Sequence, residues 1–185
     1  MTRLRVLGLA VLALGIAAFA AVSPAGSDDG AGPHIAIEDD CDPNDPAWNV
    51  RGGCTQKRGD VTFLEFAAEI SPPLDALSTA VLGHQAWRND PSYLKVNAGT
   101  TVRVKNDGGR PHTFTEVARF GGGKVPPPAG TPLNKGLTTA PECPGSLDLA
   151  AGDIAILDGL TVGDHRFMCC IHPWMRAMIT VQDKD

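Results

Sequence analysis

Aromatic side chains and runs of basic residues are both scarce in this sequence of 185 residues. It contains three Trp, one Tyr and six Phe, and its formal net charge is −5. Without a long block of Lys and Arg, the chain lacks the basic surface that nucleic-acid binding requires. Its length suits a single domain and excludes an enzyme with separate cofactor and substrate domains.

Glycine and proline are abundant by contrast, with 21 Gly and 15 Pro. This composition favours short strands joined by turns over a helical bundle. Strand-like composition or alternation occurs in residues 61–66, 92–96, 101–105, 112–117, 154–157, 165–169 and 177–181. Residues 74–82 fit a short helix or a loop equally well. About seven short strands separated by turns predict an all-β fold, a β-sandwich.

The N-terminus has the pattern of a signal peptide. Arg3 and Arg5 precede an apolar run from Val6 to Val22, and residues 18–20 read small-x-small, as signal peptidase requires. The alternative is a retained membrane anchor, because an uncharged run of this length is borderline for spanning a bilayer. We predict a signal peptide over residues 1–20 and no stable membrane insertion after cleavage. The mature chain is then acidic and exported, periplasmic or extracellular, in an oxidising compartment.

Two further stretches are poor in strand signals. Residues 21–59 are rich in Asp, Gly and Pro, and we predict that they form an N-terminal extension to a domain over residues 60–185. Residues 119–144 contain Gly121–Gly123 and Pro126–Pro128, which predict a long irregular insertion within that domain.

The five cysteines are Cys41, Cys54, Cys143, Cys169 and Cys170, and an odd number leaves one thiol without an internal partner. Cys41 and Cys54 flank a turn-rich segment, so we predict a local disulfide between them. Either one of the adjacent pair bonds to Cys143, or Cys169 and Cys170 form a strained vicinal disulfide.

One short segment places three soft or borderline metal ligands together. The thiolate of Cys169, the imidazole of His172 and the thioether of Met175 stand at i, i+3 and i+6, so a single loop can turn all three toward one point. This set suits copper, which must be held as both Cu(I) and Cu(II). A second imidazole is supplied by His112, which opens a strand after a Gly-rich turn. Met178 competes with Met175 but lies inside the last predicted strand.

Strand parity then separates the two adjacent cysteines. Phe167 and Cys169 share one face of the predicted strand and Cys170 takes the other, because side chains alternate. If Phe167 faces the core, Cys169 faces the metal. We therefore predict a Cys143–Cys170 disulfide that fastens the insertion over the outer face of the sheet.

The segment Cys169-x-x-His172-Pro173-Trp174-Met175-Arg176 resembles the copper loop of the cupredoxins, the small blue copper proteins, and its short spacing is most similar to the amicyanin type. Residues 96–102, followed by Asn106 and Pro111-His112, resemble the strand that leads to the family's first histidine ligand. The resemblance implies a Greek-key β-sandwich with one copper ion bound by His112, Cys169, His172 and Met175. It also implies single-electron transfer rather than catalysis, with His172, Pro173 and Trp174 as the electron port.

Other functions fit some of the same residues. An acidic carrier would suit a basic redox partner such as a cytochrome. The first alternative is a copper-binding or copper-delivery protein that passes no electrons. The second is a structural zinc site built from Cys169, Cys170, His172 and either His112 or Cys143. A catalytic oxidase is the third, but the sequence has no His-x-His pair that would add copper ligands.

Overall fold

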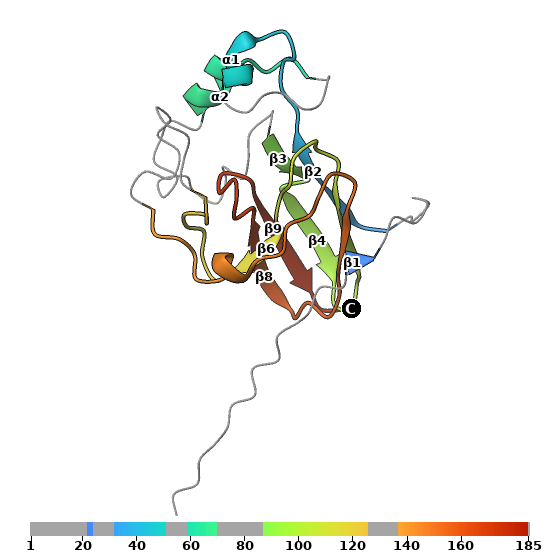
Figure 1. Ribbon diagram of the computed structural model, residues 1–185. Helices are drawn as coiled ribbons and strands as arrows, with labels where there is room; N and C mark the ends of the chain where they lie inside the picture. Colours follow the sequence, from blue (N-terminus) through green and yellow to red (C-terminus); the bar gives the residue numbers. More distant parts are fainter. Residues whose placement is uncertain (1–21, 24–31, 51–58, 70–86, 126–136, 185) are drawn as a thin grey trace, which may run out of the picture.

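The computed structural model describes residues 22–23, 32–50, 59–69, 87–125 and 137–184, which form two packed β-sheets (Figure 1). The first sheet has the order β1 (Val22–Ser23), β7 (Ile154–Leu157), β5 (Val102–Asn106), β2 (His34–Asp39) and β3 (Trp87–Asp90). The second has the order β4 (Tyr93–Asn97), β9 (Arg176–Gln182), β8 (Gly163–Met168) and β6 (Thr115–Val117). From β3 to β8 the chain crosses from one sheet to the other at every connection, so the predicted Greek-key β-sandwich is confirmed.

The core lies between the sheets and follows the alternation of the strands. In β5, Val102 and Val104 are fully buried. In β9, Ile179 is fully buried and Val181 is nearly so. Most strand pairs are antiparallel, but β2 runs parallel to β5 and β4 runs parallel to β9. Strands β4, β5, β7, β8 and β9 all lie within one or two residues of their predicted positions.

Strand β2 corrects the predicted domain boundary. Residues 21–59 were expected to lie outside the sandwich, yet His34–Asp39 pairs with β5 on one side and β3 on the other. Ile35 and Ile37 are fully buried in the core. The Ile-x-Ile alternation is short and surrounded by turn-forming residues, which concealed it. A boundary at residue 60 therefore does not separate an extension from the sheet.

The predicted strand at residues 61–66 is wrong, because helix α2 (Phe63–Glu69) occupies it. Thr62 and Glu65 form a capping box: Glu65 N–H donates to the Thr62 hydroxyl, and Thr62 N–H donates to the Glu65 carboxylate over 2.9 Å. Phe63 N–H donates to Asp45, which precedes helix α1 (Pro46–Val50). These two short helices lie at one end of the sandwich (Figure 1).

The described part of the insertion packs on the outer face of the second sheet. Gly122 forms an isolated bridge with Thr139, and a short 3-10 helix covers Cys143–Gly145. Met168 and Cys170 join Cys143 in a small apolar cluster separate from the main core. The predicted signal peptide, residues 74–82 and residues 126–136 lie outside the described residues. No helix in the described part of the chain has the length and apolar run needed to cross a bilayer.

Candidate metal centre

A tight turn brings two of the predicted ligands together at the end of β8. We call residues 169–175, between β8 and β9, the ligand loop. Cys169 N–H donates to the Met175 carbonyl over 2.9 Å, and Met175 N–H donates to the His172 carbonyl over 2.9 Å. These two bonds close the loop on itself, so Cys169 and His172 are held side by side.

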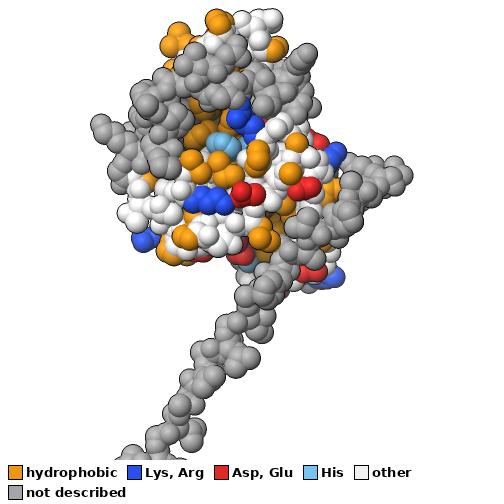
Figure 2. Space-filling model, in the orientation of Figure 1, with side chains coloured by type: hydrophobic (Ala, Val, Ile, Leu, Met, Phe, Trp, Pro, Cys, Tyr) orange, Lys and Arg blue, Asp and Glu red, His pale blue; other side chains and the backbone are white. Residues whose placement is uncertain are grey.

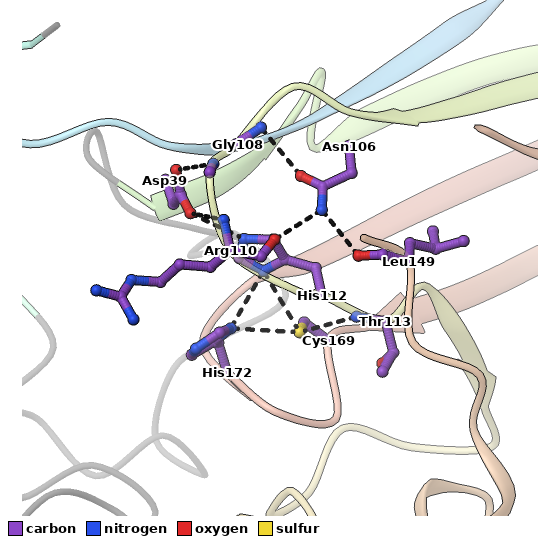
Figure 3. A network of polar contacts seen from close by, with 10 residues as sticks. Asp39, Asn106, Gly108, Arg110, His112, Thr113, Leu149, Cys169 and His172 are labelled. Carbon is purple, nitrogen blue, oxygen red and sulfur yellow. Dashed lines mark hydrogen bonds and ion pairs between the residues drawn. The ribbon is translucent and has the colours of Figure 1, made fainter. Parts of the chain in front are cut away.

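His112 comes from a different part of the chain, just after β5. Its backbone pairs with Leu149 in an isolated bridge, with hydrogen bonds of 3.0 and 2.6 Å. Asn106, fully buried at the end of β5, donates to the carbonyls of Arg110 and Leu149 and accepts from Gly108 N–H. These contacts hold the turn before His112 and aim its ring at the ligand loop (Figure 3).

The three donor groups meet at one point. The Cys169 sulfur lies 3.7 Å from Nδ1 of His112 and 3.6 Å from Nδ1 of His172, and the two Nδ1 atoms are 3.1 Å apart. In the described residues this is the one group of His, Cys, Asp or Glu whose ligand atoms converge, all within 4.8 Å. His112 and Cys169 are buried and His172 is partly exposed.

The two candidate thioethers occupy different positions. Met175 is fully buried in the ligand loop, and its backbone is hydrogen-bonded to Cys169 and His172. Met178 lies in β9, opposite Tyr93 of β4, and is half-buried. The structure thus brings Met175, rather than Met178, into the same closed loop as the converging donors.

Thr113 joins the two segments that carry these donors. Its backbone N–H donates to the Cys169 sulfur over 3.3 Å, and its hydroxyl accepts the Cys170 backbone N–H over 2.7 Å. Both contacts are buried. The Cys169 sulfur therefore has a fixed N–H donor. Because Thr113 directly follows His112, its contacts also set the spacing between His112 and Cys169.

Aromatic rings cover the site on the side of the two helices. The Trp87 ring centroid is 4.7 Å from that of His172, and the Trp174 centroid is 5.3 Å from it. Phe66 of α2 packs on Trp174, and Trp48 of α1 stacks on Trp87. Figure 2 shows a histidine side chain bordered by hydrophobic side chains and by a Lys or Arg side chain.

The aromatic rings leave little of the predicted electron port, His172, Pro173 and Trp174, exposed to solvent. Of its three residues, Pro173 and Trp174 are buried, Trp174 with only 5% of its surface exposed, whereas His172 is partly exposed. His172 is thus the residue of this group that is not buried.

Charges alternate across the site. Burial opposes ionisation of the Cys169 thiol, but the charge of His172 and hydrogen bonds with His112 and His172 outweigh it and lower the pKa of Cys169 well below its usual range. Burial disfavours protonated His112, but contacts with Asp39 and Cys169 raise its pKa to about 9. Burial likewise raises the pKa of Asp39, but His112 and the backbone N–H groups of Gly109 and Arg110 lower it overall. Without metal, the site therefore favours a thiolate beside an imidazolium.

A disulfide joins Cys143 to Cys170, as strand parity predicts. Cys169 is the free cysteine of the described residues, so a vicinal Cys169–Cys170 bond is excluded. The zinc site with two thiolates is excluded by the same bond, because it removes both Cys143 and Cys170 as ligands. Cys41 is disulfide-bonded, and its predicted partner Cys54 lies outside the described residues.

The donor set fits a single copper ion. One thiolate and two imidazoles converge in a largely buried site, with the thioether residue Met175 in the same loop. This combination is typical of copper centres that serve both Cu(I) and Cu(II), and its single thiolate is unlike the ligand sets of structural zinc sites rich in cysteine.

Sequence reasoning missed two residues at this site. Asp39, at the end of β2, contacts His112, and Trp87, in β3, packs against both histidine rings. The alternating Ile35-x-Ile37-x-Asp39 pattern was the available signal for a strand that ends in a buried carboxylate.

No protein-family model matches this chain, and no curated protein matches it either. Among solved structures it is similar to a purple cupredoxin from Nitrosopumilus maritimus, at 23% identity over 54% of this chain and 86% of that chain, with a TM-score of 0.37. It is also similar to an amicyanin mutant, at 22% identity over 49% of this chain and 70% of that chain, with a TM-score of 0.33.

Proposed function

We propose that this protein is a type 1 (blue) copper protein that carries single electrons between redox partners in the cell envelope. The observation that supports it most is the convergence of the Cys169 sulfur with Nδ1 of His112 and of His172 in a buried site. A bound copper ion would supply the one-electron change between Cu(II) and Cu(I). The proposed ligands are His112, Cys169, His172 and Met175.

The chain's contribution is to keep these donors in one arrangement. His112 is fixed by the Leu149 bridge and by Asn106, and Cys169 is fixed by Thr113 and by the closed ligand loop. Donors that cannot move present the same site to both oxidation states, which keeps the reorganisation on electron exchange small. A site built for hydrolysis would instead need an open position for substrate.

The His172 imidazole is the proposed port for electrons. It is the partly exposed member of the converging group, and the rings of Trp87 and Trp174 pack against it. The net charge of −5 favours encounter with a basic redox partner, such as a cytochrome, at low ionic strength. The proposal includes export of the protein to the cell envelope, directed by the N-terminal signal peptide.

The test is a visible absorption spectrum of the protein titrated with Cu(II), repeated on Cys169→Ser. We expect an intense thiolate-to-copper band that saturates at one equivalent, bleaches with reductant and is missing in Cys169→Ser. Far-ultraviolet circular dichroism of both proteins checks that the substitution leaves the fold intact. A wild-type protein that stays colourless with Cu(II) would overturn the proposal.

A second measurement separates an electron carrier from a copper-delivery protein, which could use the same ligands. We expect fast, reversible oxidation and reduction of the coloured protein by a basic cytochrome, slowing as salt is added. Copper that leaves the protein for a Cu(I) acceptor without reversible electron exchange would favour delivery instead.

A further inference from the structure

Asp39 lies behind His112, on the side of the ring away from the converging donors. Its Oδ2 is 3.4 Å from Nε2 of His112, whereas Nδ1 of the same ring faces Cys169 and His172 (Figure 3). Asp39 is 1% exposed and His112 is fully buried. The two nitrogens of His112 are thus divided between a carboxylate and the donor group.

The Asp39 carboxylate is itself held firmly. Gly109 N–H donates to its Oδ1 over 2.8 Å, and Arg110 N–H donates to its Oδ2 over 2.9 Å. Gly108 closes the space on the same side, because a Cβ there would stand 2.8 Å from the Asp39 Cγ. Asp39 is the last residue of β2, which is hydrogen-bonded to β5 on one side and β3 on the other, so the sheet restrains the backbone that carries the carboxylate.

We propose that Asp39 is a positioning residue of the metal centre, which holds His112 with its Nε2–H toward the carboxylate and its Nδ1 open to the ion. It acts through His112 and does not itself bind the ion. A carboxylate in this place orients the imidazole and increases its electron donation, which favours the more highly charged oxidation state. This inference rests on the proposed copper function.

The principal variant is Asp39→Asn, which keeps the size of the side chain and removes its charge. We expect Cu(II) affinity to fall about 10- to 100-fold, and Cu(I) affinity to fall less. Each tenfold excess in the loss of Cu(II) affinity raises the reduction potential by about 59 mV for a one-electron couple. Affinities are measured by competition with chelators for each oxidation state, and the potential by redox titration.

The matched control is Asp107→Asn. It makes the same change of charge in the turn between β5 and His112, but Asp107 is partly exposed and pairs with Lys105 at 3.0 Å. We expect its affinities and potential to stay near those of the wild type. A potential shift of equal size in both variants would reduce the effect of Asp39 to general charge and overturn the proposal.

Two further measurements serve if Asp39→Asn does not fold. Gly108→Ala keeps every charge but displaces the Asp39 carboxylate, and we expect it to raise the potential as well; an unchanged potential counts against the proposal. In the wild-type Cu(I) protein, nuclear magnetic resonance should show the His112 Nε2–H as a downfield, slowly exchanging proton. Its absence from that region would show that no carboxylate accepts it.

Failure of this inference and failure of the proposed function give different results. A wild-type protein with no copper band overturns the function and this role of Asp39 together. A wild-type protein with the band, and Asp39→Asn with the same affinities and potential, overturns the role of Asp39 alone.

Discussion

The backbone N–H of Thr113 points at the Cys169 sulfur over 3.3 Å, while the Thr113 hydroxyl accepts the N–H of Cys170 over 2.7 Å. One residue therefore restrains both the sulfur and the backbone beside it. Because Thr113 follows His112 directly, the same contacts set how closely the histidine segment and the ligand loop approach each other.

Thr113→Val tests this connection. Valine keeps the shape but leaves the buried Cys170 N–H without its acceptor, which costs about 1–3 kcal/mol of the free energy of unfolding. The reduction potential should also fall, because a looser Thr113 N–H bond leaves more charge on the sulfur and favours the oxidised ion. Chemical denaturation and redox titration measure the two effects. Thr113→Ser retains the hydroxyl and should stay near the wild type; equal losses in both variants would show that the methyl group, not the hydrogen bond, matters.

Met175→Leu tests which thioether belongs to the site. Leucine fills a similar volume, so the free energy of unfolding should change by less than about 1.5 kcal/mol. The copper band should shift. The reduction potential should rise, because loss of the thioether donor destabilises bound Cu(II) more than bound Cu(I). Met178→Leu is the matched control and should change neither. A spectrum altered by Met178→Leu and not by Met175→Leu would assign the donor to β9.

The residues that could be predicted from the sequence belong to patterns that span only a few neighbouring positions. Cys169, His172 and Met175 lie within one short loop, and strands β8 and β9 follow from alternation in a few neighbouring residues. Parity along β8 also predicted which of the adjacent cysteines bonds to Cys143. These inferences need no knowledge of distant segments.

The parts that were missed depend on distant or competing interactions. Asp39 and His112 are 73 positions apart, and no local pattern reports that contact. Strand β2 is fixed by pairing with β5 and β3 rather than by its own short alternation. At α2, the apolar residues of the 61–66 segment resemble a strand, but the Thr62–Glu65 capping box favours a helix.

The disulfide scheme predicts how many thiols react. With Cys143 bonded to Cys170, Cys41 bonded, and Cys169 free, the denatured, metal-free protein should show one reactive thiol per chain. Two or more would refute the scheme. The thiol is counted with a chromogenic disulfide reagent.

Removing the Cys143–Cys170 bond should weaken the fold but spare the metal centre. The bond closes a loop with a sequence separation of 27, so a double Cys143→Ala, Cys170→Ala variant should lose about 2–4 kcal/mol of the free energy of unfolding. Cys169 remains, so the copper band should persist. Loss of the band in a variant that is still folded would mean that the disulfide, through the backbone of Cys170, holds Cys169 in place.

The imidazole of His165 should make stability depend on pH. Its Nδ1 lies 2.6 Å from the Glu116 carboxylate and its Nε2 lies 2.7 Å from the Thr161 carbonyl, so both nitrogens can donate a hydrogen bond only when the ring is protonated. Burial lowers the pKa of His165, but the Thr161 carbonyl and the Glu116 carboxylate outweigh it and raise the pKa above its ordinary value of 6.5.

A raised pKa in the folded state means that the stabilisation is complete below pH 6.5 and is lost as the pH rises through the folded-state value. His165→Gln should therefore destabilise the protein more below pH 6.5 than at alkaline pH, when the free energy of unfolding is measured across the range. A constant difference between wild type and His165→Gln at every pH would mean that the ring stabilises β8 by packing alone, since packing does not depend on protonation.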